Sequence, residues 1–315
     1  MDVSEASETC NRLLDEIESA VITDREFLET VLVGVLGRGH VLLEDVPGTG
    51  KTLTARMLAE TLGVSFSRIQ FTPDLLPADV TGTHVYNERD RTFEFSDGPI
   101  FAHVVLADEI NRAPPKTQSA LLEAMEEGQV TVDGETHELP EPFFVIATQN
   151  PVDMEGTFEL PEAQVDRFAI KTTMGYPEAD GERELLQRRL DRDQQSPSVE
   201  TVLDPAQVQA LRAAPESVRV EPDLLGYMVQ ITRATRDHRH VEVGVSPRGS
   251  QRLLEMSRAR AALVGREYVT PDDVKRVAQP ALAHRIVLTP DARVDDIAKS
   301  AVVDYVLEDT PVPTV

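Results

Sequence analysis

Several residue types are scarce in this sequence, and each scarcity argues against a structural feature or a class of function. One cysteine, Cys10, occurs in 315 residues, so an intrachain disulfide is excluded. Tryptophan is absent and aromatic residues make up 5% of the chain, few for a surface that stacks single-stranded bases. There is no run of about 18 apolar residues, and the acidic start MDVSEASETC is unlike a signal peptide. We therefore expect a cytoplasmic protein with no membrane span.

Basic residues are also scarce. The chain has 31 Lys and Arg against 55 Asp and Glu, a formal net charge of -24, and lysine stands only at positions 51, 116, 171, 275 and 299. A negative field of this size repels phosphate backbones, so no nucleic-acid partner is expected. Acid-rich, lysine-poor surfaces are typical of salt-loving archaea, which predicts a halophilic archaeal source. An ordinary acidic protein is the alternative.

The first part of the chain alternates between helical and strand patterns. Residues 1–37 carry apolar side chains at helical spacing. Apolar runs that predict buried strands follow at 40–44, 66–71, 104–107, 143–147 and 168–172, with helices expected at 53–62 and 117–127. This order predicts an α/β fold with a parallel sheet flanked by helices. Alternation around Asp133-Gly134 predicts a hairpin over 129–139, and a further extended element is expected at 92–95.

The second part of the chain shows helical patterns alone. A charged stretch that ends in serine and proline, 181–200, is predicted to be a linker. Helix starts are expected at Ser246-Pro247 and at Thr270-Pro271, where a capping residue precedes a first-turn proline. The expected division is an N-terminal helical segment 1–37, an α/β core 38–180, the linker, and a small all-helical domain 201–315.

The run VPGTGKT after the strand at 40–44 predicts a phosphate-binding loop. Its glycines let backbone N–H groups curl around phosphates, Lys51 reaches the outer phosphates, and the Thr52 hydroxyl ligates Mg²⁺. The predicted ATP-binding residues are Pro47, Gly48, Thr49, Gly50, Lys51, Thr52 and Asp108. The full pattern has glycine at position 45, where this chain has Asp45, an acid that suits the site only if its side chain points away. A turn with a coincidental GKT is the alternative.

Two acids end the apolar strand at 104–107. A buried strand delivers side chains at its carboxyl end to the edge of the sheet where ligands bind. Asp108 is predicted to hold Mg²⁺ through water, together with Thr52, and Glu109 to polarise the attacking water. Taken alone the pair is compatible with ordinary loop acids, but with the phosphate-binding loop it completes the machinery for ATP hydrolysis.

Three further residues are predicted to act in catalysis. Asn150 follows the strand at 143–147, where its amide can orient water; an Asx turn before proline is the alternative. Arg167 and Arg248, the latter on the first turn of a predicted helix, can stabilise charge on transferring phosphate because guanidinium bonds two oxygens. Either arginine could instead be an ordinary surface charge.

The motifs together resemble the MoxR family of AAA+ ATPases. The similar stretches are GHVLLEDVPGTGKT, FTPDLLPADVTGT, GPIFAHVVLADEINRAPPKTQSALLEAMEEGQVTVDG, ATQNP and GTFELPEAQVDRF. They cover residues 38–180, and the resemblance extends more loosely through SPR at 246–248. It implies an AAA+ core with a helical lid, ATP and Mg²⁺ as cofactors, and a homo-oligomeric ring, usually a hexamer.

The resemblance also implies roles and partners. Asn150 is expected as the first sensor, Arg167 as the arginine finger that acts on the adjacent subunit, and Arg248 as the second sensor. Protein clients are expected, often with von Willebrand A domains, for a chaperone-like maturation activity. The stretch VITDR at 21–25 departs from the family, so no adenine contact is predicted, and Arg112 fits an interface role less well than a local ion pair.

Three other functions are compatible with parts of the sequence. The same ATPase core serves nucleic-acid motors and clamp loaders, but the net charge argues against them. A magnesium-chelatase-like ATPase subunit has similar motifs, which fit this chain less well. A nucleotide-gated scaffold without turnover is disfavoured by the presence of both Glu109 and Arg167.

Overall fold

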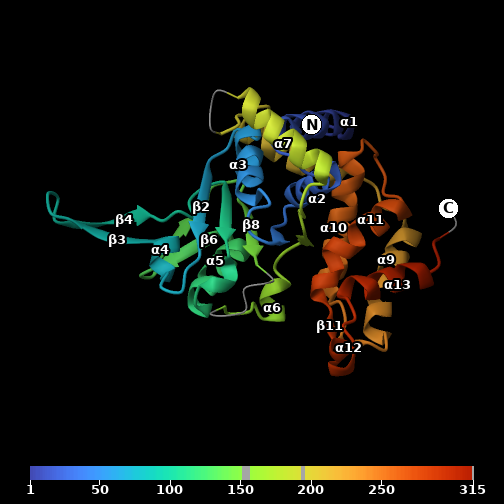
Figure 1. Ribbon diagram of the computed structural model, residues 1–315. Helices are drawn as coiled ribbons and strands as arrows, with labels where there is room; N and C mark the ends of the chain where they lie inside the picture. The colour runs from blue at the N-terminus through green and yellow to red at the C-terminus, as the bar shows by residue number, and fades with distance from the viewer. Residues whose placement is uncertain (151–156, 193–195, 314–315) are drawn as a thin grey trace.

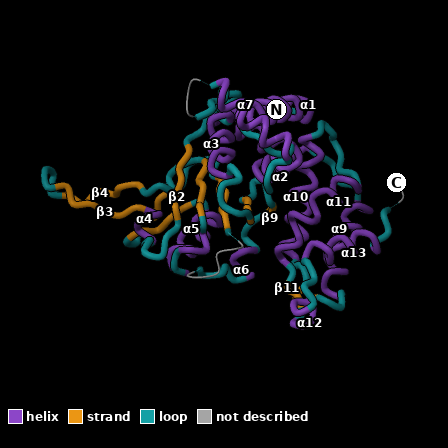
Figure 2. Tube along the Cα trace, in the orientation of Figure 1, coloured by secondary structure: helices purple, strands orange, loops and turns teal. Residues whose placement is uncertain are grey.

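The computed structural model describes residues 1–150, 157–192 and 196–313. Pro151 and Gly156, at the ends of two of the motifs above, and residues 193–195 of the expected linker lie outside these ranges. The described chain forms an α/β core, a group of helices beside it, and a two-stranded ribbon that extends away from the core (Figure 1). Figure 2 shows that strands gather on the side of the ribbon and helices on the opposite side.

A five-stranded parallel sheet forms the centre of the core, in the order β2-β5-β8-β1-β9. Its strands are β1 (Val41–Glu44), β2 (Phe66–Gln70), β5 (Val104–Asp108), β8 (Phe144–Gln149) and β9 (Ile170–Thr172). All five lie within the predicted strand segments or within two residues of them, so the predicted α/β fold class is confirmed. Because β8 lies between β1 and β5, the carboxyl ends of these three strands meet at one edge.

Alternate residues of each central strand enter two apolar layers. Val41 and Leu43 pack on one face of the sheet, whereas Leu42 packs on the other. The first face is covered by α1 (Val3–Ala20), α2 (Arg25–Leu36) and α3 (Lys51–Thr61). The second face is covered by α5 (Pro115–Glu127) and the short α4 (Pro77–Thr81). Burial on both faces explains why the strands read as unbroken apolar runs rather than as alternating ones.

Two antiparallel hairpins leave the core at the side of α5. One is β3 (Gly82–Asn87) with β4 (Thr92–Asp97), the ribbon that extends away in Figure 1. The other is β6 (Gln129–Val132) with β7 (Glu135–Glu138), where Asp133 and Gly134 take φ of 52° and 88°. Positive φ at both turn residues is what a two-residue hairpin loop requires, so this predicted hairpin is confirmed. The element expected at 92–95 is β4, whose partner β3 was not predicted.

The C-terminal part consists mainly of helices. They are α8 (Pro205–Ala213), α9 (Pro222–Asp237), α10 (Pro247–Leu263), α11 (Pro271–Leu282), α12 (Pro290–Val294) and α13 (Lys299–Asp309). Ser246 and Thr270 cap α10 and α11 as predicted, since each side chain accepts a backbone N–H of the first turn. A small ladder of β10 (Val241–Val243) with β11 (Val287–Leu288) was not expected. Helices α10 and α11 share an apolar core with α1 and α2.

The structure differs from the expected linker at 181–200. Helix α7 (Ala179–Asp191) occupies most of it, and the shorter α6 (Glu162–Val165) precedes it. Glutamate, arginine and leucine are good helix formers, and Glu184 pairs with Arg188 one turn later. Arg188 also donates to the carbonyls of Glu18 (2.7 Å) and Ser19 (2.8 Å), which ties α7 to the end of α1. Among the described residues, no helix is both long and apolar enough to cross a bilayer.

Candidate active site

The phosphate-binding loop joins β1 to α3 with a backbone that only glycine adopts freely. Gly48 and Gly50 have φ of 86° and 102°. Gly50 caps α3 without a side chain, so the first N–H groups of the helix have no capping side chain to bond. Thr49 is buried, and its Oγ1 atom has no hydrogen-bond partner among the described residues. Free backbone donors beside an unpaired hydroxyl at a helix N-terminus fit an anionic phosphate.

Lys51 is held in place by the loop itself. Its Nζ atom donates to the carbonyls of Asp45 (2.8 Å) and Val46 (2.9 Å). An ammonium group has three donors, so one remains for a phosphate oxygen. Burial lowers the pKa of Lys51, and the nearby carboxylates of Asp45, Asp108 and Glu109 act in the opposite direction. The lysine is therefore oriented by backbone contacts and lies within the field of the predicted Mg²⁺ and base residues.

The acid at position 45 turns away from the phosphate site. Asp45 is buried, and its Oδ2 atom accepts the backbone N–H of Met174 and that of Gly175 (3.1 Å). Two N–H donors stabilise the carboxylate without a phosphate nearby. Asp45 therefore points away from the phosphate site, as an acid at this position must. Its two hydrogen bonds join the segment after β9 to the loop.

Asp108 and Glu109 are both fixed by one hydroxyl group. Thr148 Oγ1, on the neighbouring strand β8, donates to Asp108 Oδ1 (2.7 Å) and accepts the N–H of Glu109 (2.8 Å). Glu109 stands in the left-handed region at φ 56° and ψ 51°, a conformation that costs a non-glycine residue of order 1 kcal/mol. Such strain persists at functional sites when the surroundings hold it, and the Thr148 bond does so here.

Strand β2 supplies two hydrogen-bond partners for Asp108 and Glu109 that the sequence did not predict. Gln70 pairs with Asp108 in the parallel register, and Arg68 lies two residues earlier on the same face. Arg68 Nη2 and Nε donate to Asp108 Oδ2 at 2.7 and 3.1 Å, and Gln70 Nε2 donates to Glu109 Oε2 at 2.8 Å. The one signal in the sequence was the alternation of polar residues in a strand otherwise expected to be buried. Arg112 also pairs with Glu109, at 3.0 Å, which is the local ion pair favoured above.

Asn150 lies where the strand order requires. It directly follows β8, between the ends of β1 and β5, and its side chain is buried. The structure thus brings Asn150 to the same edge of the sheet as Lys51, Asp108 and Glu109. Thr52 is half-buried on the first turn of α3, at this edge as well.

Arg167 and Arg248 meet at another carboxylate, Glu126 near the end of α5. Arg248 Nη1 contacts Glu126 Oε1 at 2.8 Å, and Arg167 Nε contacts Oε2 at 3.3 Å. The hydrogen bond from Arg248 lowers the pKa of Glu126, helped by the charge of Arg167. Asp166 lies beside them, 4.0 Å from Arg248 Nε, and also pairs with the buried Arg285. The structure therefore brings the two predicted arginines together at Glu126 rather than at the phosphate-binding loop.

A cavity of about 530 Å³, which the sequence did not predict, opens beside the loop. Thr49 and Gly50 line one side, Val21 and Ile22 another, and Leu53 and Leu185 extend its apolar wall. Its size and mixed lining suit a small-molecule ligand. An apolar wall next to phosphate donors is what a purine base attached to a triphosphate needs, and α7, the expected linker, provides part of it.

Comparisons with known proteins agree with this geometry. Residues 40–170 match the family described as "ATPase family associated with various cellular activities (AAA)", and residues 233–306 match the AAA lid domain. The protein YeaC of Bacillus subtilis is 47% identical over 96% of this chain and 94% of its own length. Chaperone MoxR1 of Mycobacterium tuberculosis is 41% identical over 98% of this chain and 83% of its own.

The chain belongs to the MoxR family of AAA+ ATPases. A crystal structure of a proposed ATPase from Cytophaga hutchinsonii has the same fold, with a TM-score of 0.92 and 37% identity over 99% of this chain and 97% of that one. In this MoxR-family protein the lid match spans α10 to α12 and parts of the helices on either side, so the helices after α9 form an AAA lid as expected.

Proposed function

We propose that this MoxR-family protein binds ATP with Mg²⁺ and hydrolyses it. The observation that carries the proposal is the Thr148 hydroxyl, which joins Asp108 and Glu109 at the edge of the sheet that Lys51 also faces. The hydroxyl holds Glu109 in a strained backbone conformation, and strain of this kind clusters at functional sites.

Each residue then has a defined task. The N–H groups at the start of α3 and the remaining donor of Lys51 bind the β- and γ-phosphates. Thr52 and Asp108 would hold Mg²⁺, Asp108 through water, while Thr148 and Arg68 orient the carboxylate of Asp108. When bound, Mg²⁺ neutralises charge that develops on the phosphate oxygens. Glu109 polarises the attacking water, and Asn150 orients that water.

A pair of variants tests this assignment. Glu109→Gln keeps the shape of the side chain but removes the base, so turnover should fall roughly 10³-fold while ATP still binds. Lys51→Ala should lose ATP binding in a calorimetric titration, because the loop loses its one cation. Glu123→Gln, on the exposed side of α5, is a control that should leave both measurements unchanged. Steady-state hydrolysis near wild type in Glu109→Gln would refute the assignment.

We further propose that the protein works as a homo-oligomeric ring, a hexamer as the family resemblance implies. Within one protomer, Arg167 and Arg248 are both held by Glu126. If Arg167 serves as the arginine finger for the adjacent subunit, Arg248 stands on the same side and can reach the same triphosphate. The ATP site is then completed by two arginines from a neighbour, and hydrolysis depends on assembly.

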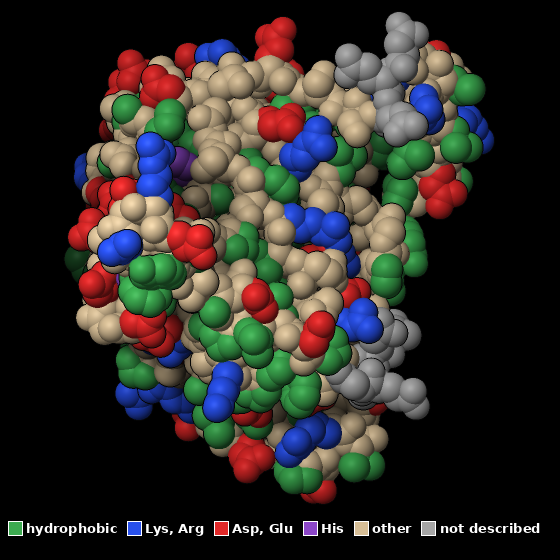
Figure 3. Space-filling model, turned by 90° about the vertical axis from the view of Figure 1, so that its left-hand side faces the viewer, with side chains coloured by type: hydrophobic (Ala, Val, Ile, Leu, Met, Phe, Trp, Pro, Cys, Tyr) green, Lys and Arg blue, Asp and Glu red, His purple; other side chains and the backbone are tan. Residues whose placement is uncertain are grey.

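The clients are proposed to be proteins, von Willebrand A domain proteins among them, which the protein remodels or matures as a chaperone. The relative MoxR1 is named a chaperone. The β3–β4 ribbon exposes apolar side chains, Val85, Tyr86 and Phe93, that suit contact with a protein. On the face toward which this ribbon points, acidic, basic and hydrophobic side chains are intermixed (Figure 3), unlike the basic stripe of a nucleic-acid footprint.

Affinity capture tests the client proposal. The Glu109→Gln variant should hold ATP, and with it a client, so capture with ATP should recover partner proteins that capture by Lys51→Ala does not. Stimulation of turnover by DNA or RNA that resists added salt would instead support a nucleic-acid motor. A magnesium-chelatase-like subunit would be indicated if the captured partner were a metal-inserting enzyme.

The acidic composition supports two smaller proposals. With 55 acids against 31 basic residues, mutual repulsion destabilises the folded chain until salt screens it. We propose a cytoplasm rich in salt as its compartment, as in salt-loving archaea. The melting temperature should then rise steadily from 0.1 M to 2 M KCl, and a flat or falling curve would contradict the halophilic source.

A further inference from the structure

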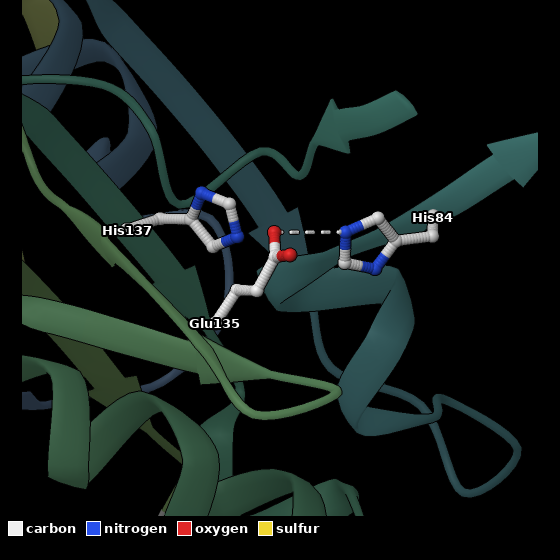
Figure 4. A group of neighbouring side chains, drawn as sticks. All are labelled: His84, Glu135 and His137. Carbon is white, nitrogen blue, oxygen red and sulfur yellow. Dashed lines mark ion pairs between the residues drawn. The ribbon is translucent and has the colours of Figure 1, made fainter. Parts of the chain in front are cut away.

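A cluster of histidine and carboxylate side chains joins the two hairpins. His84 comes from β3, and Glu135 and His137 come from β7, where their spacing of two places them on one face. Each offers a ligand atom, and these three atoms lie within 4.8 Å of one another. Figure 4 shows the Glu135 carboxylate between the two imidazole rings. The cluster is separate from the nucleotide site and takes no part in the chemistry described above.

The histidine rings are fixed by their surroundings. His137 stacks on Phe95 of β4, with ring centroids 3.7 Å apart and an interplanar angle of 12°. The ring of His84 meets the same Phe95 edge-on, at 5.6 Å. Phe95 therefore restricts both rings, and little side-chain entropy is left to lose when a ligand binds them.

The imidazole nitrogen atoms of the cluster differ in whether they have a hydrogen-bond partner. His84 Nδ1 contacts Asp133 Oδ2 at 3.1 Å, which leaves His84 Nε2 facing Glu135 Oε2 at 3.5 Å. Nε2 of His137 is buried and has no hydrogen-bond partner among the described residues. A buried polar atom without a partner costs about 1–3 kcal/mol. A cation between the three residues would satisfy that nitrogen.

We propose that His84, Glu135 and His137 bind a divalent transition-metal ion of the Zn²⁺ type. Two imidazoles and one carboxylate form a His₂Glu donor set, with a fourth position left for water or another ligand. Asp133 holds the far nitrogen of His84, as a carboxylate does behind many metal-bound histidines. Metal-to-ligand bonds of about 2.0–2.2 Å require the ligand atoms to close by roughly 1 Å, which rotation of the exposed Glu135 side chain permits while the rings stay in place.

The donor set separates this site from the Mg²⁺ site. Two imidazole ligands favour Zn²⁺, Co²⁺, Ni²⁺ or Cu²⁺, whereas Mg²⁺ and Ca²⁺ prefer oxygen ligands. Excess Mg²⁺ should therefore leave the histidine site free for a transition metal. Cys10, the sole thiol, is buried and its pKa is raised to about 12 by desolvation, so it does not compete for the ion.

A bound ion would couple the two hairpins mechanically. The β3–β4 ribbon contacts the β6–β7 hairpin through this cluster, and β6 directly follows α5, which carries Glu126. The ion would therefore fix the base of the exposed apolar ribbon relative to α5. The apolar ribbon would be more rigid, and less accessible to proteases, when metal is bound.

The experiment uses the full chain without a histidine tag, freed of metal by a chelator and dialysed into buffer with excess Mg²⁺. Zn²⁺ is titrated by calorimetry, and Co²⁺ by its visible absorption. Wild type should bind about one equivalent of Zn²⁺ at micromolar concentration or tighter, with Co²⁺ giving the intense absorption of a four-coordinate ion. His137→Gln should weaken Zn²⁺ binding at least tenfold, and Asp133→Asn should weaken it roughly tenfold.

The control is His103→Gln, which removes a histidine bonded to Ser65 and should bind Zn²⁺ like wild type. Glu135→Gln, exposed beside the turn, replaces His137→Gln if the latter does not fold by circular dichroism. Millimolar binding by wild type, or equal binding by wild type and the folded ligand variant, would overturn the proposal.

Discussion

Two groups of acids differ in what holds them. At the edge of the sheet, Asp108 and Glu109 are bound by Thr148 and by side chains of β2, all within one protomer. At the end of α5, Glu126 is about a third exposed and contacts two arginines, Arg167 and Arg248. In the first region the partners fix the acids, whereas in the second the acid fixes its partners. The acids of the first region are therefore fixed within one protomer, whereas the two arginines of the second region contact a partly exposed carboxylate.

The largest expected effect is on the second region. Arg167→Ala should keep ATP binding but lower turnover of the assembled ring roughly 10³-fold, because charge on the transferring phosphate loses a bidentate donor. Arg248→Ala should lower it in the same way. Turnover and ATP binding are measured at a concentration where the ring is assembled, with the exposed Arg183→Ala as control.

Mixing variants decides where these arginines act. Lys51→Ala subunits cannot bind ATP but carry intact arginines, so adding them to Arg167→Ala subunits should restore part of the turnover. Restoration in the Arg248 mixture as well would show that both arginines act on a neighbour. If Arg167→Ala rings hydrolyse ATP like wild type, another arginine is the finger.

The next effect concerns the first region. Thr148→Val keeps the shape of the side chain but removes both hydrogen bonds, to Asp108 and to the Glu109 N–H. Turnover should fall roughly 10²-fold, as when one fixed donor is lost from an active site, with ATP binding little changed. Thr148→Ser, which restores the hydroxyl, should recover most of the activity. Equal loss in both variants would mean that packing rather than the hydroxyl matters.

A smaller effect concerns the connection between the two regions. The buried His40 reaches the Met125 carbonyl of α5 through Nε2 (3.0 Å) and accepts the N–H of Val145 on β8 through Nδ1 (3.0 Å). Desolvation lowers the pKa of His40 to about 4, against an ordinary 6.5. Between these values the unfolded chain binds more protons than the folded one, so stability falls as pH drops.

The expected loss from His40 is about 2 kcal/mol between pH 7 and pH 5, measured by urea unfolding at fixed salt. His284, whose pKa desolvation also lowers, should add to the loss in the same direction. His103→Gln should remove only part of this pH dependence, because desolvation lowers the pKa of the half-buried His103 as well. Stability that is constant from pH 7 to pH 5 would contradict the buried neutral state of His40.

The smallest effect is expected for Glu126→Gln. The ion pairs that it removes are partly exposed, so the free energy of unfolding should change by less than about 1 kcal/mol. Ring turnover should stay at the wild-type value or rise a few-fold. In the variant, Arg167 and Arg248 do not have to break an ion pair with Glu126 before they bind phosphate. A loss above about 2 kcal/mol would show that Glu126 holds the lid in place instead.

The strand segments and the backbone pattern of the loop were predictable because they depend on local patterns. Buried parallel strands give apolar runs, a phosphate-binding loop needs glycines and lysine in a fixed order, and caps such as Thr270 act within one turn. The linker at 181–200 was predicted wrongly because charge alone does not distinguish a solvated helix from a loop. Strand β3 was missed because its two faces are both largely exposed, which removes the alternation that marks a strand.

The sequence by itself determined the fold class, and it predicted a phosphate-binding loop and two adjacent acids, since each rests on neighbours in the chain. Only the tertiary structure decided that Thr148, Arg68 and Gln70 hold those acids, that Asp45 turns away, and that Arg167 and Arg248 share Glu126. It also brought His84 to within reach of His137, 53 positions later in the chain. These contacts join distant segments, and the pairing of strands and the packing of α5 against the sheet, rather than local spacing, set which residues meet.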